Sequence, residues 1–201
     1  MKTALKRICL LLVVLPVMTI AASTQDERGH YYVPMREVEM EIKDFNFATL
    51  GGQAIKLSDA VKGKKLVLIH YFAAWCHNSN FDVETMKELY EKYKDRGFLV
   101  IGVCEYSKPD ELREFIEKHK PTYPICMEGD GKMKDRTGTT HYTYRNQIDD
   151  NRHWGTPLNL LIDADDVAKR RDIVVGRVRI AAGEVIKSEF EELIRERLSQ
   201  K

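Results

Sequence analysis

The sequence has almost no net charge, few cysteines and, beyond its first twenty residues, no long apolar run. It contains 32 Lys and Arg against 31 Asp and Glu, and the formal charge of +1 gives no reason to expect a nucleic-acid partner. After the N-terminal segment, no stretch is apolar enough to span a bilayer. Internal repeats and low-complexity tracts are also missing. With 43% hydrophobic residues in 201, the chain has enough apolar material for the core of one domain.

The N-terminal segment has the layout of a secretory signal peptide. Basic residues precede an apolar stretch over residues 8–20, and small residues follow it over residues 21–23. The apolar stretch is shorter than the ~20 residues that a spanning helix needs, so cleavage is favoured over an uncleaved anchor. We therefore expect a signal peptide over residues 1–22 and a periplasmic or extracellular protein. The protein would be associated with a membrane only through an uncleaved signal segment.

Four cysteines are present, and three would remain after cleavage: Cys76, Cys104 and Cys126. Disulfides persist in exported proteins, but an odd number leaves at least one thiol unpaired within a monomer. An exposed unpaired thiol permits a covalent dimer, so we expect a monomer or a weak dimer. Because residues 1–22 hold three Lys and Arg and no acid, their removal would change the formal charge from +1 to −2.

The remaining pattern predicts one α/β domain. We expect residues 23–40 to be a linker or loosely ordered arm and residues 41–199 to be the domain. Alternating runs on either side of Gly51-Gly52 predict a β-hairpin. Buried strands are predicted over 66–72, 98–104, 123–127, 158–163 and 173–180, and helices over 81–97, 109–119 and 184–198. Strands that alternate with helices predict a mixed, mostly parallel sheet covered on both faces, a three-layer α/β/α sandwich.

Cys76 lies where the first buried strand is expected to give way to a helix. The segment Trp75-Cys76-His77-Asn78-Ser79 follows the apolar run 66–72 almost directly. Unpaired N–H groups in the first turn of a helix, together with the positive end of its dipole, favour a thiolate over a thiol. The sequence therefore predicts a reactive sulfur at this position.

Three features together resemble the thioredoxin superfamily. They are Trp75-Cys76-x-x-Ser79 after a buried strand, Gly155-Thr156-Pro157 before the strand 158–163, and the hairpin that lies between Asp44-Phe45 and Ser58-Asp59. The hairpin and the additional helix and strand over 109–127 are most similar to the exported TlpA-like thiol-disulfide oxidoreductases, which are related to the redoxin group. The resemblance covers roughly residues 41–198.

The resemblance implies a thioredoxin-like fold with an N-terminal β-hairpin and an inserted helix-strand unit. It also implies exchange with a disulfide- or thiol-containing protein or with a small-molecule thiol, without a cofactor or metal. A cis peptide bond is implied between Thr156 and Pro157, facing Cys76 and offering backbone hydrogen bonds to a peptide substrate. Proline is the residue that adopts the cis form at low cost, whereas an ordinary trans proline at a strand entry is the alternative.

Ser79 departs from the pattern of the family, because members that act as dithiol oxidoreductases have a second cysteine there. Cys76 can attack a disulfide and form a mixed disulfide, but a hydroxyl at Ser79 cannot expel the substrate by completing an internal disulfide. We therefore predict a monothiol route through a CxxS site. Ser79 could still donate a hydrogen bond to the sulfur of Cys76 and favour the thiolate.

Two histidines near Cys76 are candidate catalytic groups. His70 lies six residues before the cysteine, where thioredoxins place a buried acid, and it could relay protons or act as a cation. The alternative is a core histidine with a backbone partner. His77 is expected at the exposed start of the helix, where a protonated ring would favour the thiolate, or where it is a simple surface residue.

Cys104 ends the second buried strand, and parallel sheets carry functional groups at the carboxyl ends of their strands. It is a candidate resolving thiol for Cys76, or a disulfide partner for Cys126 if the third strand lies alongside. Plain core packing is the favoured alternative, because buried cysteines commonly act as small apolar residues.

The segment 138–155 is predicted to be an irregular aromatic insertion beside the site. It holds His141, Tyr142, Tyr144, His153 and Trp154 just before Thr156-Pro157. We interpret it as a lid or a substrate-recognition surface, with Trp75, Trp154, Thr156 and Pro157 as substrate-binding residues. A metal held by two histidines and Cys76 is a sharper alternative, but the segment lacks a tight ligand spacing.

Three functions remain open from the sequence. The first is an exported oxidoreductase that engages disulfides through Cys76 and is resolved by an external thiol or by Cys104. The second is a redox-inactive binding or chaperone-like module that uses the aromatic segment. The third is a peroxiredoxin-like peroxidase, although residues 72–75 lack the pattern that peroxiredoxins place before their reactive cysteine.

Overall fold

The computed structural model describes residues 24–25, 29–129, 131, 133–168 and 173–200. The expected signal peptide and its cleavage site lie outside these residues. The strands are β1 (Thr24–Gln25), β2 (Tyr31–Val33), β3 (Arg36–Lys43), β4 (Asn46–Ala48), β5 (Ala54–Lys56), β6 (Leu66–Phe72), β7 (Phe98–Cys104), β8 (Ile125–Met127), β9 (Leu158–Asp163), β10 (Ile173–Ala181) and β11 (Glu184–Val185). The helices are α1 (Leu57–Ala60), α2 (His77–Tyr93), α3 (Pro109–His119), α4 (Thr140–Gln147), α5 (Ala164–Ala168) and α6 (Lys187–Ser199), with short 3-10 turns η1 (Lys94–Arg96) and η2 (Met133–Gly138).

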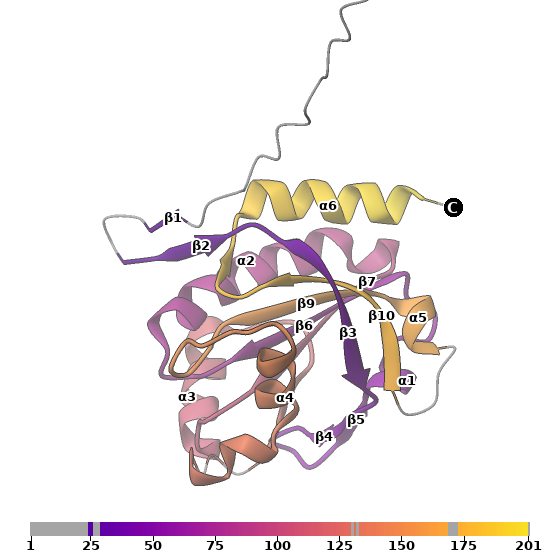
Figure 1. Ribbon diagram of the computed structural model, residues 1–201. Helices are drawn as coiled ribbons and strands as arrows, with labels where there is room; N and C mark the ends of the chain where they lie inside the picture. Colours follow the sequence, from indigo (N-terminus) through magenta and orange to yellow (C-terminus); the bar gives the residue numbers. More distant parts are fainter. Residues whose placement is uncertain (1–23, 26–28, 130, 132, 169–172, 201) are drawn as a thin grey trace, which may run out of the picture.

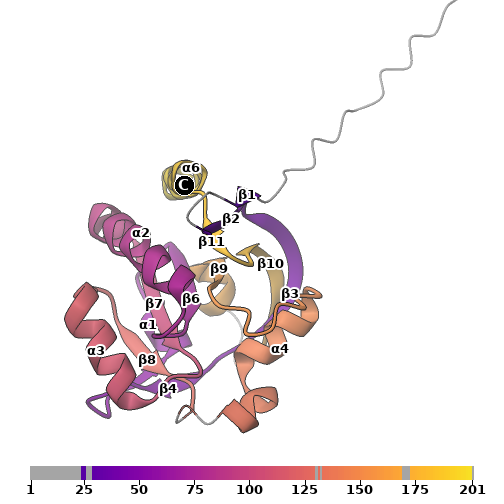
Figure 2. The same cartoon turned by 90° about the vertical axis from the view of Figure 1, so that its left-hand side faces the viewer.

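The molecule has three layers around one large sheet with the strand order β3-β10-β9-β6-β7-β8-β4-β5. Helices α2, α3 and α6 pack on one face, and α1, α4 and α5 pack on the other (Figures 1 and 2). Each face has its own apolar cluster, since successive side chains of a strand point to opposite faces. The predicted α/β/α sandwich is therefore confirmed.

The centre of the sheet is formed by β6 and β7, whose residues are all buried. Strands covered on both faces read as continuous apolar runs, and these two lie over the predicted ranges 66–72 and 98–104. They pair in parallel through α2, and β8 joins them in parallel through α3. Their carboxyl ends therefore meet at one edge of the sheet, where α2 begins.

The expectation of a mostly parallel sheet was wrong. Of the neighbouring pairs in the large sheet, β6–β7 and β7–β8 are parallel and the other five are antiparallel. Strands β9 and β10 are separated by nine residues, 164–172, of which the described ones form α5, and this is shorter than the crossover of a dozen or more residues that a parallel neighbour requires. Alternation of strands and helices along the chain did not reveal this difference.

The segment expected to be a linker or loose arm, residues 23–40, contains strands instead. Strand β3 pairs with β10 from Arg36 to Lys43, and β2 pairs in parallel with β11. Met40 and Ile42 point into the core, while the residues that alternate with them, Glu39, Glu41 and Lys43, are exposed. The mixed composition of this segment is that of an edge strand with one solvated face, so it resembled a linker in the sequence.

The segment expected to be an irregular insertion, 138–155, contains helix α4. Thr139 is its N-cap, and its hydroxyl accepts a hydrogen bond from the N–H of Tyr142 at 3.1 Å. Tyr144 is fully buried, and its hydroxyl accepts a hydrogen bond from the N–H of Lys43 at 2.8 Å. Within the described part of the chain, no helix is long and apolar enough to cross a membrane.

Candidate functional site

Cys76 is the N-cap residue of α2 and is half-buried. Its backbone is extended, and its N–H donates to the carbonyl of Ala73 at 3.0 Å, which turns the chain from β6 into the helix. The first turn of α2 has no acidic residue, so no side-chain charge offsets the positive end of the helix. The thiol thus lies at the start of a helix, the position at which helices generally stabilise thiolates.

The carbonyl of Thr156 faces the Cys76 sulfur. The sulfur donates a hydrogen bond to this oxygen at 3.5 Å, and the peptide bond between Thr156 and Pro157 is cis, as the resemblance implies. The alternative of an ordinary trans proline is therefore excluded. The cis bond brings the backbone that precedes β9 directly opposite the reactive thiol.

Asn80 fixes the backbone on either side of the cysteine, and the sequence analysis did not single it out. Its amide nitrogen donates to the carbonyls of Ala74 at 2.7 Å and Cys76 at 2.9 Å. Its oxygen accepts from Lys118 at 3.0 Å and lies 2.8 Å from Nε2 of His119. A polar residue four positions after the cysteine, on the same helix face, was the available signal.

Ser79 is fully buried one turn into α2. Its hydroxyl accepts a hydrogen bond from the N–H of Ala73 at 3.4 Å. Among the described residues, no hydrogen bond joins this hydroxyl to the sulfur of Cys76, so the expected donor role differs from the geometry observed. The side chain supports the turn that precedes the helix.

His70 lies under α2, close to Asn159 of β9 and to Asp82 of α2 itself. We call these three residues the histidine layer. His70 and Asn159 face each other across β6 and β9, and Nδ1 of the ring lies 2.8 Å from the amide oxygen. The amide nitrogen donates to Asp82 at 2.9 Å. Burial lowers the pKa of His70 to about 4 and raises the pKa of Asp82 to about 7.

The histidine layer therefore holds neutral groups. The 3.7 Å separation between His70 and Asp82 is not an ion pair, because burial favours the neutral form of each group and outweighs the hydrogen bonds of Asn159, which favour the charged forms. The expectation of a cation at His70 is not what this burial favours, and the ring's partner is a side-chain amide rather than a backbone group. Its Nε2 has no hydrogen-bond partner within the described residues.

A second buried group lies on the opposite face of the sheet, and we call Glu105, Glu128 and Thr140 the carboxyl layer. Glu128 accepts hydrogen bonds from the N–H and the hydroxyl of Thr140, both at 2.6 Å. Burial raises the pKa of Glu105 well above its ordinary value, and the charge of Glu128 adds to this shift. In the described structure no hydrogen-bond partner reaches either oxygen of Glu105, and the raised pKa favours the protonated acid.

The two other cysteines that the structure describes, Cys104 and Cys126, are buried, unpaired and on opposite faces of the sheet. Cys126 pairs with Val103 in the β7–β8 register, so it shares a face with that residue and not with Cys104. The suggested disulfide between Cys104 and Cys126 is therefore wrong. Burial raises the pKa of both thiols to about 12, which disfavours the thiolate.

An aromatic rim lies beside Cys76, formed by Trp75, Tyr106, His153 and Trp154. Trp75 is 41% exposed, and its ring nitrogen donates to the carbonyl of Tyr106 at 2.9 Å. Its ring meets the ring of Trp154 edge to face at 5.5 Å, and His153 stacks on Trp154 at 4.6 Å. The structure thus brings together the two tryptophans that were expected to bind substrate.

Buried Arg145 holds the loop that leads to the cis bond, a role that the sequence did not reveal. It donates to Asp150 at 3.1 Å and to the carbonyl of Trp154 at 3.2 Å. Burial alone would raise the pKa of Asp150, but hydrogen bonds and charge from Arg152 lower it. Gly155 has φ +71, and a Cβ there would meet the guanidinium of Arg145, so only glycine fits beside it.

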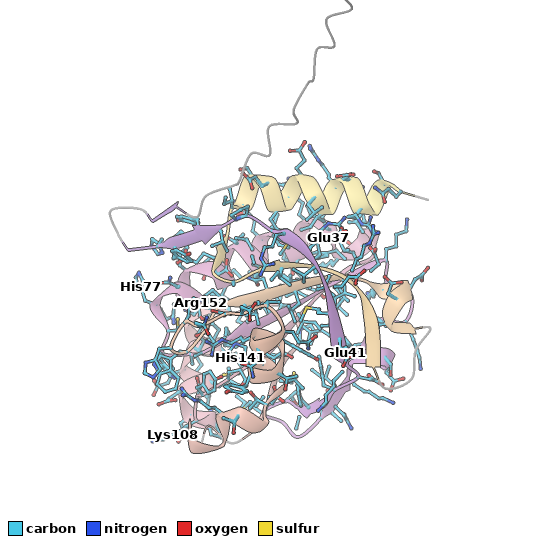
Figure 3. The ribbon with its side chains drawn as sticks, in the orientation of Figure 1. Glu37, Glu41, His77, Lys108, His141 and Arg152 are labelled. Carbon is cyan, nitrogen blue, oxygen red and sulfur yellow. The ribbon has the colours of Figure 1, made fainter. Side chains whose placement is uncertain are left out.

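His141 also supports this loop. Its Nδ1 lies 2.8 Å from the hydroxyl of Tyr106, and its Nε2 lies 3.3 Å from the carbonyl of Gly155 (Figure 3). Burial lowers the pKa of His141 to about 3, so the ring is neutral and connects the rim to the cis bond. In the part of the chain that the structure describes, no three His, Cys, Asp or Glu side chains are grouped to hold a metal ion.

His77 is exposed at the start of α2, as expected, and it has an unexpected neighbour. The ring of His30 stacks on it at 4.9 Å, although His30 belongs to the segment expected to be a linker. Buried Glu184 lies 3.1 Å from Nδ1 of His30. The sequence contains no signal for this contact, because the three residues are far apart in the chain.

Comparisons with known proteins agree with this architecture. Residues 38–177 match the AhpC/TSA family. The thiol-disulfide oxidoreductase ResA of Oceanobacillus iheyensis is 26% identical over 128 residues, which cover 64% of this chain and 65% of that protein. The thioredoxin-like protein YneN of Bacillus subtilis is 31% identical over 94 residues, covering 46% of this chain and 54% of that protein. This chain therefore spans less than two thirds of the length of these relatives.

Solved structures share the fold at low sequence identity. A thiol:disulfide interchange protein of Chlorobium tepidum has a TM-score of 0.60 at 19% identity, covering 81% of this chain and 98% of that one. A secreted thiol-disulfide isomerase of Corynebacterium glutamicum has a TM-score of 0.56 at 14% identity, covering 95% and 99%. Because the family match extends over more than half of the sequence and these structures share its architecture, the chain belongs to the AhpC/TSA family and has a thioredoxin-like fold.

Proposed function

We propose that this protein is an exported thiol-disulfide oxidoreductase that acts through Cys76 alone. The observation that carries the proposal is the half-buried Cys76 thiol at the start of α2, 3.5 Å from the carbonyl of Thr156. The similarity to the thiol-disulfide oxidoreductase ResA and to a thiol:disulfide interchange protein supports this class of reaction. The N-terminal sequence pattern and the word "secreted" in the name of the Corynebacterium protein support export.

The reaction begins when the Cys76 thiolate attacks one sulfur of a substrate disulfide. A bond forms between Cys76 and that sulfur, the substrate disulfide breaks, and the departing thiolate takes a proton from solvent. An external thiolate then attacks the substrate sulfur of this mixed disulfide and releases Cys76 as a thiolate. The substrate leaves joined to the external thiol, so the second exchange conserves bonds and electrons.

An external thiol is required because no thiol among the described residues is well suited to resolve the intermediate. Ser79 occupies the position one helical turn from Cys76 and carries a hydroxyl. Burial raises the pKa of Cys104 to about 12, so its attacking thiolate is scarce. Cys104 is thus a much weaker candidate for the resolving role than a thiol from solution.

The substrate is a peptide segment or a small molecule that carries a disulfide. The carbonyl of Thr156 offers an acceptor for a backbone N–H when the thiol proton has left. The aromatic rim offers Trp75 and Trp154 as an apolar surface directly beside the sulfur. The positive charge of Arg136 lies 5.6 Å from the ring of Trp154, which extends this surface with a cation.

The direct test traps the intermediate. Reduced protein is mixed with a disulfide-bonded peptide, quenched in acid and analysed by mass spectrometry. We expect one adduct on Cys76, none in Cys76→Ser, and an unchanged adduct in Cys104→Ala, since Cys104 is buried. An adduct on Cys104, or none on Cys76, would contradict the proposal.

A second variant tests the monothiol step. Ser79→Cys places a thiol one helical turn from Cys76, where it can displace the substrate by forming an internal disulfide. We expect the adduct to become short-lived without added thiol, whereas the parent adduct persists.

If Cys76→Ala retains a protein client as well as the parent does, the binding-module function is favoured instead.

A further inference from the structure

His30 covers the helix start that carries the reactive thiol. Its side chain is 4% exposed, and its ring lies 3.9 Å from the ring of Phe81 and 4.9 Å from that of His77. The interplanar angle with His77 is 22°, which is a stacked arrangement. His77 follows Cys76 directly in the sequence and lies at the edge of the molecule (Figure 3). His30, from the N-terminal part of the chain, therefore contacts the residue next to the reactive cysteine.

Glu184 anchors this histidine from the other end of the chain. Its carboxylate lies 3.1 Å from Nδ1 of His30 and accepts from the N–H of Tyr31 at 3.4 Å. Strands β2 and β11 pair in parallel and bring these residues together near α6 (Figure 2). Gly183 allows this approach, because a Cβ there would lie 2.9 Å from the carbonyl oxygen of Tyr31.

The carboxylate of Glu184 interacts with both imidazole rings. Burial raises the pKa of Glu184, while the hydrogen bond and charge of His30 and the charge of His77 oppose that shift. An attraction between opposite charges acts on both groups, so a carboxylate at Glu184 also draws the ring of His77 toward the pair whenever that ring carries a proton. One oxygen of Glu184 has no hydrogen-bond donor within the described residues. The other oxygen makes the contacts with His30 and with the N–H of Tyr31.

Neither member of this pair belongs to the part of the chain that matches the family. The match covers residues 38–177, whereas His30 precedes it and Glu184 follows it. Both are nonetheless buried against the first turn of α2 or beside it. The ends of this chain thus add to a site whose core is shared with the family.

We propose that His30 and Glu184 are positioning residues of the Cys76 site, which hold the ring of His77 over the start of α2. A cation next to a thiol stabilises its thiolate, so a ring held at this place acts on Cys76 whenever it carries a proton. The inference rests on the proposed function in that it assigns the control of the same thiol.

Other charged groups surround the start of α2 and remain as they are in the test. They are His70 beneath the helix, Asp82 and Glu84 on the helix itself, Arg152 on the loop that carries Thr156, and Lys118 and His119 at the end of α3 beside Asn80. Burial lowers the pKa of His70 and raises that of Asp82, so these two are neutral near pH 6. The variants below change only the pair from the two ends of the chain.

The test measures the alkylation of Cys76 by iodoacetamide against pH in the full-length reduced protein, with the labelled peptide quantified by mass spectrometry. We expect Glu184→Gln, which keeps the size of the side chain, to raise the midpoint pH of alkylation by about half a unit. His30→Phe keeps a ring on Phe81 but loses the hydrogen bond to Glu184, so it should move the midpoint in the same direction. Glu88→Gln removes an exposed charge further along α2 and should leave the midpoint unchanged.

A double-mutant comparison separates this role from a structural one. In a His77→Ala background, Glu184→Gln should no longer move the midpoint. A shift of the same size without His77, or no shift in a Glu184→Gln protein that melts at the parent temperature, would overturn the proposal. Alkylation needs a thiolate but no disulfide substrate, so this result stands apart from the success or failure of the mixed-disulfide experiment.

Discussion

The histidine layer and the carboxyl layer lie on opposite faces of the same sheet, and each buries ionisable groups near the carboxyl ends of its central strands. In the histidine layer, Asn159 stands between His70 and Asp82 and is a hydrogen-bond partner of each. In the carboxyl layer, burial and the charge of Glu128 favour a proton on Glu105, whose oxygens have no hydrogen-bond partner within the described residues. Burial thus favours the neutral acid or base in both layers, and only the first layer has an amide between its ionisable groups.

The difference has a consequence for the thiol. Neither layer supplies a buried cation under Cys76, so the start of α2 and groups at the surface are the neighbours that can act on the charge of the thiol. The carboxyl layer instead ties β8 to α4, since Glu128 accepts from the first N–H groups of that helix. One layer packs beneath the helix of the nucleophile, and the other holds the helix that leads to the cis bond.

The largest expected effect concerns the pH dependence of the histidine layer. The folded pKa of His70, about 4, is below its unfolded value of 6.5, so its contribution to stability is present above pH 6.5 and lost as pH falls toward 4. The folded pKa of Asp82, about 7, is above its unfolded value of 3.8, so its contribution is present below 3.8 and lost as pH rises toward 7. In the parent protein the two trends oppose each other across the shared window.

Asp82→Asn mimics the protonated acid and should expose the trend of His70 alone. We expect the free energy of unfolding of this variant to rise by about 3 kcal/mol from pH 4 to pH 6.5, measured by urea titration at each pH. The parent should change far less over that range. Glu88→Gln, an exposed change on the same helix, should follow the parent, and a parallel response of Asp82→Asn and the parent would contradict a neutral layer.

The carboxyl layer should be most sensitive at Glu128. Glu128→Ala leaves the N–H and hydroxyl of Thr140 without their acceptor, which should lower the free energy of unfolding by about 2 kcal/mol. Glu105→Gln keeps a group that can donate to Glu128 and removes a buried acid, so it should stay within about 1 kcal/mol of the parent. Equal losses of stability in both variants, measured by urea titration, would contradict a protonated Glu105 beside Glu128.

The aromatic rim should affect binding and leave both layers intact. Trp154→Ala removes the ring that meets Trp75 edge to face, and we expect about fivefold weaker binding of a disulfide-free peptide analogue, or about 1 kcal/mol. The midpoint of Cys76 alkylation should not move. Unchanged peptide affinity by calorimetry would remove Trp154 from the recognition surface.

The smallest effect is expected at Ser79. Its hydrogen bond from Ala73 is long, 3.4 Å, and its hydroxyl does not contact the sulfur in the described structure, so Ser79→Ala should cost less than about 1 kcal/mol. The alkylation midpoint should also stay at the parent value. A clear upward move of that midpoint would show that the hydroxyl does act on the Cys76 thiolate.

Much of the fold could be predicted from local sequence because its central elements are buried on both faces. Apolar runs marked β6, β7 and β9 at their observed ends, and Pro109 marked the start of α3. The edge strand β3 escaped recognition, since half of its side chains are solvated. Helix α4 escaped because its buried face is built from His141, Tyr144 and Arg145, residues that also occur in loops.

By itself, the sequence determined the thioredoxin-like class, the place of Cys76 at the end of a buried strand, and the absence of a second thiol at Ser79. These are properties of consecutive residues, and apolar periodicity and residue identity are enough to read them. Only the tertiary structure decided that Cys104 and Cys126 face opposite sides of the sheet, that Asn159 pairs with the buried ring of His70, and that His30 and Glu184 meet beside His77. Those outcomes depend on register and on burial between segments far apart in the chain, which set both contacts and charge states.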